Sequence, residues 1–544
     1  MPPSVGTDSW LADPSLRAWQ RRALARLAEW KGGPFLLAAA PGAGKTRPAL
    51  VLARELLRRG EIRRVAVVCP TSPLTRQWAA AAGALGLQLL PDAPELRTTR
   101  DFHGIAVTYA RVGQAPQAFA RGCGPDTLVI ADEAHHLGDD LTWGSGFARA
   151  FAATDRWLLL SGTPFRSDDL PIPGVRYEDG VAVPDFAYTY GEAIADGVCR
   201  RVVFIPYDGV LQWQSGDEVY EASFADDIAA REAARRYRTA ISAKLANGLP
   251  RILAAAHERL REIRASGHPD AGALAIAADS EHAREIRDAL ERITGTRPVM
   301  VLHTEARAAE KLRAFMRSTD EWIVAVNMVS EGVDIPRLRV GVYATAARTP
   351  LVFRQIVGRF VRTAGGKATD LSYLYLPADR TLQAYANDIE HELRHAMRPR
   401  DEEPPPEGLD EVPDRRETER GEDLTFVPVS ADVSPQMSLF GDPDPAPAPA
   451  PSTVVRVRST PAPPPPPPEP EEVPVYARRE ALRKQRHQLV SELSRQTGRS
   501  HAEINAQING ALGIASVQEA SLEQLERSIG LLLDRLRAAS RSAV

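Results

Sequence analysis

Two series of short apolar runs alternate along the chain with longer segments in which apolar residues recur at helical spacing. In the first series, residues 64–69, 105–108, 128–131 and 157–160 are expected strands, and residues 47–59 and 72–85 are expected helices. Parallel strands need a long crossover connection, so this rhythm predicts β-α-β units. The second series has expected strands at 274–277, 298–302, 322–326, 340–344 and 371–376. The pattern therefore predicts an α/β fold with two tandem parallel sheets.

The pattern stops near residue 400. Residues 401–475 hold 20 of the 44 prolines and carry 17 acidic against 5 basic side chains. Such a composition buries too little apolar surface to offset the entropy of ordering, which predicts a disordered, acidic, Pro-rich linker. We therefore expect a first domain at 1–205, a polar, partly helical connection at 206–250, a second domain at 251–400 and the linker at 401–475.

Helical spacing returns at 476–544, where we expect a small helical domain. Leu482, Leu489 and Leu493 share one face, and Ser500 and Ser521 each open a capping box. The first of these helices is basic. Its charges form either a solvated face, which is the preferred interpretation, or a nucleic-acid-binding stripe of Arg478, Arg479, Arg483, Lys484 and Arg486.

Composition narrows the class of protein. Hydrophobic residues make up 44% of the chain and charged residues 25%, as in ordinary soluble proteins. No run approaches the length of a membrane span and no signal-peptide pattern opens the chain, so we expect a cytoplasmic protein with no membrane partner. Three widely spaced cysteines argue against a zinc site. The net charge of −4 is the sum of −12 in residues 401–475 and +4 in each of 1–400 and 476–544. The mild excess of positive charge in the two parts expected to fold suits a partner with a phosphate backbone.

Two motifs carry the chemistry of a nucleoside triphosphatase. Residues 38–46 read AAAPGAGKT, in which Ala39 replaces the first glycine of the usual P-loop pattern. Backbone N–H groups of such a loop surround phosphates, the lysine reaches the outer phosphates, and the threonine hydroxyl binds magnesium. We assign these roles, which require ATP and Mg²⁺ as cofactors, to Gly42, Ala43, Gly44, Lys45 and Thr46.

The second motif, Asp-Glu-Ala-His, follows the apolar run 128–131. A buried strand there would deliver Asp132 to the metal and Glu133 to the attacking water. We expect Lys45, Asp132 and Glu133 to be catalytic, and Thr46 and Asp132 to hold the metal.

Further motifs follow in a fixed order, and together with these two they resemble the helicases of superfamily two. They are Leu-Arg-Ala-Trp-Gln at 16–20, Cys-Pro-Thr-Ser-Pro-Leu-Thr-Arg-Gln-Trp at 69–78, Val-Thr-Tyr at 107–109, Ser-Gly-Thr-Pro at 161–164, the segment 327–336 and Gln-Ile-Val-Gly-Arg-Phe-Val-Arg at 355–362. The resemblance implies that the two sheets belong to RecA-like lobes. The DEAH-type segment at 128–136, together with the Leu-Arg-x-x-Gln start at 16–20, looks more like the DNA translocases related to type III restriction subunits, bacterial repair helicases and the XPB group than like DEAD-box RNA helicases.

The same resemblance implies roles for residues beyond the P-loop. Arg359 and Arg362 would be arginine fingers that reach the γ-phosphate, and Gln20 would contact the base. Gly332 and Asp334 would line the nucleotide site. Coupling of nucleotide state to movement is expected from His135, Ser161, Thr163 and Gln355. Nucleic-acid phosphates are expected at Thr71, Arg76, Thr108, His303, Thr304 and Ser330, for each of which helix capping or loop polarity is the alternative.

The resemblance implies an ATP-dependent DNA helicase or translocase in DNA repair, replication or recombination. The alternatives are an RNA helicase or a nucleic-acid-stimulated ATPase scaffold. The second class includes the motor subunit of a restriction or defence complex. Within the linker, Gln436, Met437, Ser438, Leu439 and Phe440 resemble the peptide that binds bacterial sliding clamps. An exposed Leu-Phe pair in a polar linker needs a binding partner, so we expect this segment to recruit the clamp.

Overall fold

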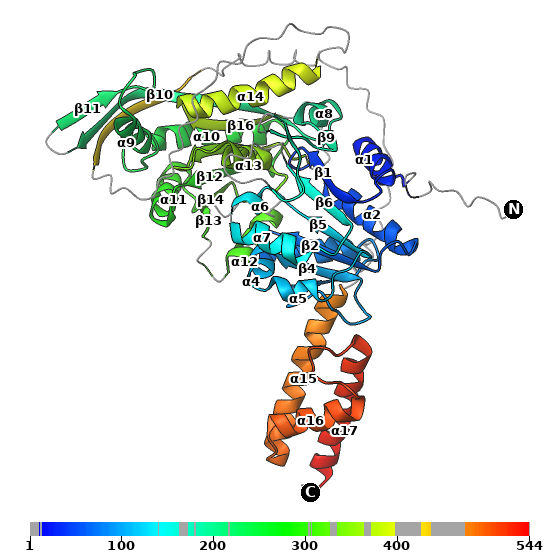
Figure 1. Cartoon of the computed structure of the whole chain (residues 1–544). Helices are drawn as coiled ribbons and strands as arrows, with labels where there is room; N and C mark the ends of the chain where they lie inside the picture. The colour runs from blue at the N-terminus through cyan, green and yellow to red at the C-terminus, as the bar shows by residue number, and fades with distance from the viewer. Residues whose placement is uncertain are drawn as a thin grey trace, which may run out of the picture. The chain divides into compact units, whose positions relative to one another are not determined.

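The computed structural model describes residues 10, 13–139, 141–162, 172–178, 181–215, 218–302, 305, 307–326, 335–363, 371–397, 426–436 and 474–542. Its contacts divide the chain into two compact units. The first comprises Met1–Ala38, Gly44–Ala187 and Pro449–Val544, and the second comprises Ala39–Ala43 and Tyr188–Ala448. Helices pack around the sheet of each unit, as Figure 1 shows. No described helix is both long enough and apolar enough to cross a membrane.

The sheet of the first unit has the strand order β3-β4-β2-β5-β6-β1-β9, and its register is parallel at each neighbouring pair from β3 to β1. Its strands are β1 (Gly33–Ala39), β2 (Arg64–Cys69), β3 (Leu89–Pro91), β4 (Gly104–Thr108), β5 (Thr127–Ala131), β6 (Arg156–Ser161) and β9 (Phe186–Tyr188). A separate antiparallel pair joins β7 (Tyr177–Glu178) to β8 (Val181–Ala182). The connecting helices are α1 (Ala18–Ala28), α2 (Thr46–Arg58), α3 (Ser72–Gly83), α4 (Tyr109–Gln114), α5 (Pro116–Ala120), α6 (His136–Asp139) and α7 (Leu141–Ala150).

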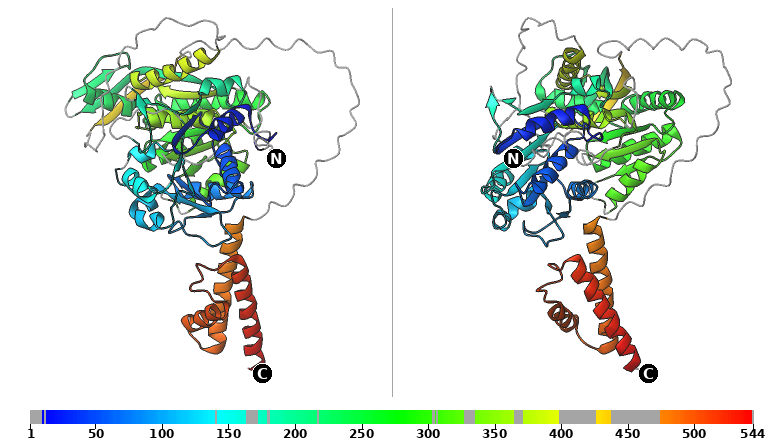
Figure 2. Two further views of the ribbon diagram at one scale, coloured as in Figure 1. Left: turned by 45° about the vertical axis from the view of Figure 1, so that its right-hand side comes forward. Right: turned by 90° about the vertical axis from the view of Figure 1, so that its right-hand side faces the viewer.

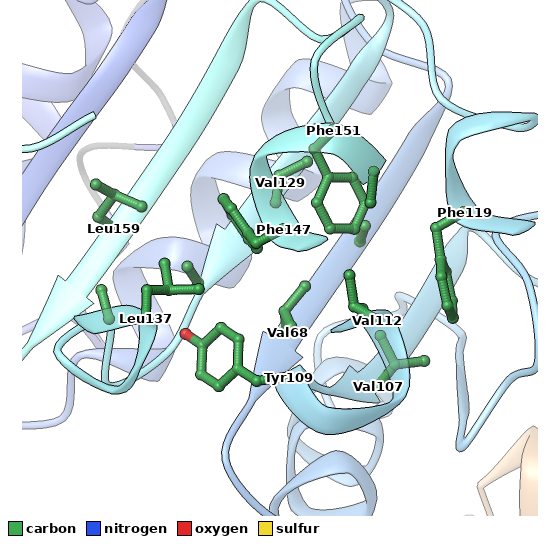
Figure 3. Packing of buried hydrophobic residues seen from close by; sticks show 14 of the residues in the cluster. Val68, Val107, Tyr109, Val112, Phe119, Val129, Leu137, Phe147, Phe151 and Leu159 are labelled. Atoms are coloured by element: carbon green, nitrogen blue, oxygen red, sulfur yellow. The ribbon is translucent and has the colours of Figure 1, made fainter. Parts of the chain in front are cut away.

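Both faces of this sheet are covered, which explains why its strands are continuous apolar runs rather than alternating ones. All five residues of β5 are buried. On one face, Val68, Val107 and Val129 pack against Phe147 and Phe151 of the α7 region (Figure 3). The expected parallel sheet is confirmed, and its central strands carry the motif residues at their carboxyl ends.

The second unit contains an eight-stranded sheet with the order β11-β10-β16-β15-β12-β14-β13, and β17 pairs with β10 as well. The strands are β10 (Arg201–Ser215), β11 (Glu218–Ala222), β12 (Gly272–Ala277), β13 (Val299–Val301), β14 (Trp322–Val326), β15 (Leu338–Ala344), β16 (Leu371–Pro377) and β17 (Val427–Pro435). The helices are α8 (Tyr190–Ala195), α9 (Ala230–Ala240), α10 (Leu249–Ala265), α11 (Ser280–Thr294), α12 (Ala308–Arg317), α13 (Pro350–Phe360) and α14 (Arg380–Met397). The second parallel sheet expected from the sequence is thus present, with antiparallel additions at β11 and β17.

The expected connection at 206–250 differs from the structure in its first part. Strand β10 runs through residue 215, pairs in parallel with β16 over its first half, and pairs with β11 and β17 over its second half. Tyr207, Leu211 and Trp213 are buried while Gln212 and Gln214 are not. Polar residues alternate with buried ones here, because only one face of this part of the sheet is covered. The polar composition of residues 206–215 therefore led the sequence analysis to miss this part of a strand.

Part of the expected linker also differs from the prediction, because residues 427–435 form β17, the gold strand beside β10 in Figure 1. Ala431 and Val433 are buried, and Arg251 forms an ion pair with Asp432 at 2.8 Å. The backbone N–H of Gln436 donates to the Pro206 carbonyl at 2.8 Å. The prediction failed for these nine residues because the apolar positions recur with period two within a stretch whose average composition is polar.

Residues 474–542 form the expected helical domain, with α15 (Val475–Thr497), α16 (His501–Leu512) and α17 (Leu522–Ser542). Helices α15 and α17 lie side by side in both views of Figure 2. Gly498 ends α15 at φ 70°, and Ser500 forms the expected capping box with Glu503. A small apolar core includes Val490, Leu493, Ile504, Ile508 and Leu532.

The preferred interpretation of the basic face of α15 was wrong for two of its arginines. Arg479 and Arg486 are buried. The Arg479 guanidinium lies 5.3 Å from the Phe102 ring and donates to the Gln518 carbonyl. Arg486 donates to the side-chain oxygens of Asn505 and Asn509. Long arginine stems pack well against apolar surface, so a basic helix face can be part of a core.

Candidate functional site

The P-loop lies between β1 and α2. Gly42 and Gly44 have φ values of 77° and 91°, a left-handed conformation that glycine adopts without steric cost. Lys45 is the N-cap residue of α2, and Thr46 is its first residue. The helix therefore directs its free N–H groups and the positive end of its dipole toward the loop, an arrangement that binds phosphates. The residues present thus fit the phosphates of a nucleotide.

The acidic motif lies at the carboxyl end of buried strand β5. Glu133 has a φ of 50°, which costs a residue with a side chain about 1–2 kcal/mol. Its Oε1 lies 3.7 Å from Lys45 Nζ, and its Oε2 lies 3.7 Å from His135 Nδ1. The turn therefore brings Glu133, Lys45 and His135 together from two loops of the same unit.

Asp132 is held at three points of its backbone and side chain. Its backbone N–H donates to the Val68 carbonyl at 2.8 Å, and its own carbonyl accepts from the Tyr109 hydroxyl at 2.7 Å. The Trp78 indole N–H donates to Asp132 Oδ2 at 2.7 Å. Burial and, to a lesser extent, the Glu133 charge raise the pKa of Asp132 to about 6, although the Trp78 hydrogen bond and the Lys45 charge act in the opposite direction. A divalent cation would favour the ionised form, so this carboxylate and the Thr46 hydroxyl fit Mg²⁺.

Gln20 lies beside the P-loop, on α1. Its side-chain Nε2 donates to the Gly44 carbonyl at 3.0 Å, and its Oε1 accepts the Arg17 N–H at 2.9 Å. The side chain is buried, and a Cβ atom added at Gly44 would lie 3.2 Å from Gln20 Nε2. Gln20 thus supports the glycine loop directly, and its expected contact with the base stays a prediction.

Ser161 ends β6 and is fully buried. It is paired in register with Ala38 of β1, the strand that leads into the P-loop. The backbone N–H of Ala134 donates to the Leu160 carbonyl at 2.9 Å, which ties the acidic motif to the same strand. Ser161 and His135, two expected coupling residues, are therefore linked through β6 to the strand that leads into the P-loop and to the turn that carries the acidic pair.

The expected arginine fingers lie at the end of α13. Arg359 is buried, and Arg362 follows the helix. Residues 39–43 are grouped with the second unit, to which α13 also belongs. Within that unit, a Cβ atom added at Gly42 would lie 2.7 Å from Arg362 Cγ. Arg362 is therefore packed against a P-loop glycine, and Gln355 is a half-buried residue of the same helix.

Among the expected nucleic-acid contacts, Thr71 and Thr108 are the N-cap residues of α3 and α4. The Thr108 side chain accepts the Arg111 N–H, which is the capping role named above as the alternative. Arg76 lies on α3 with its side chain 66% exposed, 3.6 Å from Asp92. The remaining expected site residues lie outside the described residues: Thr163, His303, Thr304, Ser330, Gly332, Asp334, Met437, Ser438, Leu439 and Phe440.

Sequence reasoning gave no role to Trp78 and Tyr109, although both lie within motifs that it identified. Both are buried aromatic residues with a polar tip, and such residues usually find a hydrogen-bond partner. Their place as the last residues of two of the motifs was visible in the sequence. The partner of each tip was not, because Asp132 lies 54 and 23 residues away.

Comparison with known proteins places this site in a family. A model of the family described as "Type III restriction enzyme, res subunit" matches residues 13–166, which include Gln20, the P-loop, the acidic motif and Ser161. The chain belongs to helicase superfamily two. The helicase-like domain implies nucleotide binding and the use of ATP.

Mycobacterial relatives of this superfamily-two protein extend the match beyond that domain. The uncharacterized protein Rv2917 of Mycobacterium tuberculosis is 42% identical over 439 residues, which cover 79% of this chain and 72% of the relative. The uncharacterized protein ML1624 of Mycobacterium leprae is 41% identical over 391 residues, or 70% of this chain and 65% of the relative.

A solved fragment of a putative HsdR subunit of a type I restriction enzyme from Vibrio vulnificus has a TM-score of 0.48 at 18% identity, covering 70% of this chain and 68% of the fragment.

Proposed function

We propose that this protein is an ATP-dependent DNA helicase or translocase that couples hydrolysis to movement on DNA or remodelling of DNA. The observation that carries the proposal is the approach of Lys45 Nζ to Glu133 Oε1, 3.7 Å apart at the N-terminus of α2. A phosphate-binding lysine beside a carboxylate at the mouth of a P-loop is the arrangement needed to bind a nucleoside triphosphate and activate water.

Each residue has a role in this chemistry. Backbone N–H groups at Gly42, Ala43 and Gly44 bind the phosphates, and Lys45 neutralises the charge that develops on the outer ones. Thr46 and Asp132 would hold Mg²⁺, which would supply positive charge to neutralise the phosphates. Glu133 accepts a hydrogen bond from the attacking water and orients it.

Arg359 and Arg362 act on the γ-phosphate. Hydrolysis removes the charge that these guanidinium groups bind, which gives nucleotide state an effect on the conformation of the second unit. The packing of Arg362 against Gly42 supports this role, because the glycine belongs to the phosphate-binding loop. Ser161, His135 and Gln355, together with Thr163, transmit the change.

DNA is the proposed substrate. Two observations support it: the family description names a restriction subunit, and the first 400 residues carry a net charge of +4. The proposed contacts are short hydroxyls and backbone groups on phosphates, with Arg76 as the exposed cation of α3. Contacts of this kind bind without reading the base sequence.

The decisive experiment measures steady-state ATPase rates with no nucleic acid, single-stranded DNA, duplex DNA, forked DNA and RNA, alongside strand displacement. We expect stimulation by DNA with little base preference and an affinity that falls as salt rises. Stimulation by RNA alone identifies an RNA helicase instead. A rate that no nucleic acid changes overturns the proposal. Stimulation without movement on DNA identifies a switchable scaffold or the motor of a restriction complex.

We also propose that Gln436–Phe440 recruits the protein to a bacterial sliding clamp. Strand β17 ends one residue before this segment, and its first residue, Gln436, is exposed. An anchored and exposed start supports presentation of a short peptide to a partner.

A further inference from the structure

Two buried aromatic residues from different elements hold the same aspartate. Trp78 of α3 donates its indole N–H to Asp132 Oδ2 at 2.7 Å, and the Tyr109 hydroxyl donates to the Asp132 carbonyl at 2.7 Å. Trp78 is 1% exposed and Tyr109 is fully buried. In Figure 3 the Tyr109 ring lies in the core between Leu137 and Val68, so packing fixes its position.

Each of these aromatic residues is next to a proposed nucleic-acid contact. Helix α3 follows Thr71 and carries the exposed Arg76 two residues before Trp78. Helix α4 begins at Tyr109, directly after Thr108. The proposed contact Arg76 is thus exposed on α3, while Trp78 of the same helix and Tyr109 of α4 bond to the residue proposed to hold magnesium.

The two hydrogen bonds are sensitive to small movements of α3 and α4. A hydrogen bond weakens steeply when its distance or angle departs from the optimum, and a buried acceptor that loses its donor keeps the cost of its desolvation. The bond from Trp78 is to a carboxylate, which makes it stronger than a neutral one. A shift of either element would therefore change the orientation of the Asp132 carboxylate or backbone.

We propose that Trp78 and Tyr109 are positioning residues through which nucleic acid bound at α3 and α4 orients Asp132 for hydrolysis. The inference rests on the proposed function, because it explains how a nucleic-acid-stimulated ATPase senses its strand. Neither side chain touches nucleotide or nucleic acid; both act through Asp132.

The test compares Tyr109→Phe and Trp78→Phe with the wild-type protein. Tyr109→Phe deletes one hydroxyl and keeps the ring that lies 6.3 Å from Trp143, so the fold is preserved even where the larger change at Trp78 lowers stability. The readout is the ratio of the DNA-stimulated kcat to the basal kcat. We expect each variant to lower this ratio about fivefold or more, the lower end of typical coupling between sites. The affinity for DNA should stay within about twofold, since no phosphate contact is removed.

Trp157→Phe is the matched control. It removes an indole N–H from the same core, but one that donates to the Phe151 carbonyl at 3.1 Å. This control should keep the wild-type ratio. A double variant, Trp78→Phe with Tyr109→Phe, should lower the ratio by less than the product of the single effects, because both bonds act on one residue.

The outcomes separate the inference from the proposed function. If DNA does not stimulate the wild-type protein, the proposed function fails and the inference fails with it. If DNA stimulates the wild type and both single variants to the same ratio, only the inference is overturned. A purely structural role would lower the basal and stimulated rates together and leave the ratio unchanged, which also overturns it.

Discussion

The left-handed backbone at Glu133 is the most informative feature at the scale of single residues. Glu133, whose carboxylate faces a P-loop lysine, has a strained φ at the place where the chemistry is proposed. Backbone hydrogen bonds of the flanking Asp132 and Ala134 hold this conformation. In this conformation Glu133 Oε1 lies 3.7 Å from Lys45 Nζ.

This geometry predicts different defects for the two partners. Glu133→Gln should retain ATP binding and lower kcat by orders of magnitude, because the amide cannot accept a proton from water. Lys45→Ala should weaken nucleotide binding instead, since it removes the cation at the phosphates. Nucleotide binding and steady-state hydrolysis measured on both variants check the assignment. Near-normal turnover by Glu133→Gln contradicts it.

A second residue-scale prediction concerns His282 of α11. Its Nδ1 accepts the Ala278 N–H at 3.2 Å and its Nε2 lies 2.8 Å from the Ile241 carbonyl, so the neutral ring with a proton on Nε2 fits both partners. Burial lowers the pKa of His282 below its ordinary value of 6.5. The unfolded chain then binds the extra proton more readily, so this residue's contribution to stability is complete above pH 6.5 and is lost as the pH falls below it.

Thermal unfolding between pH 8 and pH 5.5 checks this prediction. His282→Asn keeps an acceptor near the Nδ1 position and removes the titrating group. The difference in Tm between the wild type and this variant should shrink as the pH falls. A difference that is constant with pH would show that protonation of His282 does not affect stability.

Sequence and structure agree best for residues whose roles depend on local spacing. Lys45 and Thr46 lie at the start of helix α2, and Asp132 and Glu133 directly follow strand β5, because a P-loop and a strand-end carboxylate are local patterns. Trp78 and Tyr109 could not be assigned in this way. Their common partner is set by the order of β2, β4 and β5 in the sheet, which no single segment encodes.

At the scale of elements, the fully buried strands were the easiest to predict. The expected runs at 64–69, 105–108, 128–131 and 157–160 lie within β2, β4, β5 and β6. Strand β17 was missed because composition averaged over 75 residues conceals a nine-residue alternation. The second half of β10 was missed for a related reason, since one side of its sheet is polar.

The alternation in β17 yields a prediction with an internal control. Val433 is fully buried, whereas Val429 of the same strand is 45% exposed. Val433→Asp places a charge in the core and should detach the strand from β10, at a cost of about 3 kcal/mol or more. Val429→Asp should leave the strand in place.

Hydrogen exchange of residues 427–435 and 207–214 measures the result. Protection of both segments should fall in Val433→Asp and be retained in Val429→Asp. Equal protection in the two variants would contradict the pairing of β17 with β10.

At the scale of the whole molecule, β17 changes what the Pro-rich segment can do. The backbone of Gln436 is bonded to Pro206, so the proposed clamp-binding peptide starts from a fixed point on the second unit. Residues 437–473 then separate that point from the helical domain that begins at α15. A partner bound to Gln436–Phe440 would be held close to the motor, which raises its effective concentration there.

The final prediction tests this recruitment. A peptide spanning residues 434–442 should bind a bacterial sliding clamp with a Kd of roughly micromolar, because a short segment must be ordered on binding. Leu439→Ala with Phe440→Ala should abolish binding by removing the apolar side chains that fill the partner's pocket. Fluorescence anisotropy of both peptides against the purified clamp provides the measurement. In the full chain, the same double substitution should leave DNA-stimulated ATP hydrolysis intact, since these residues lie outside the nucleotide site. Equal binding by the two peptides, or no binding at high micromolar clamp, would show that the segment recruits no clamp.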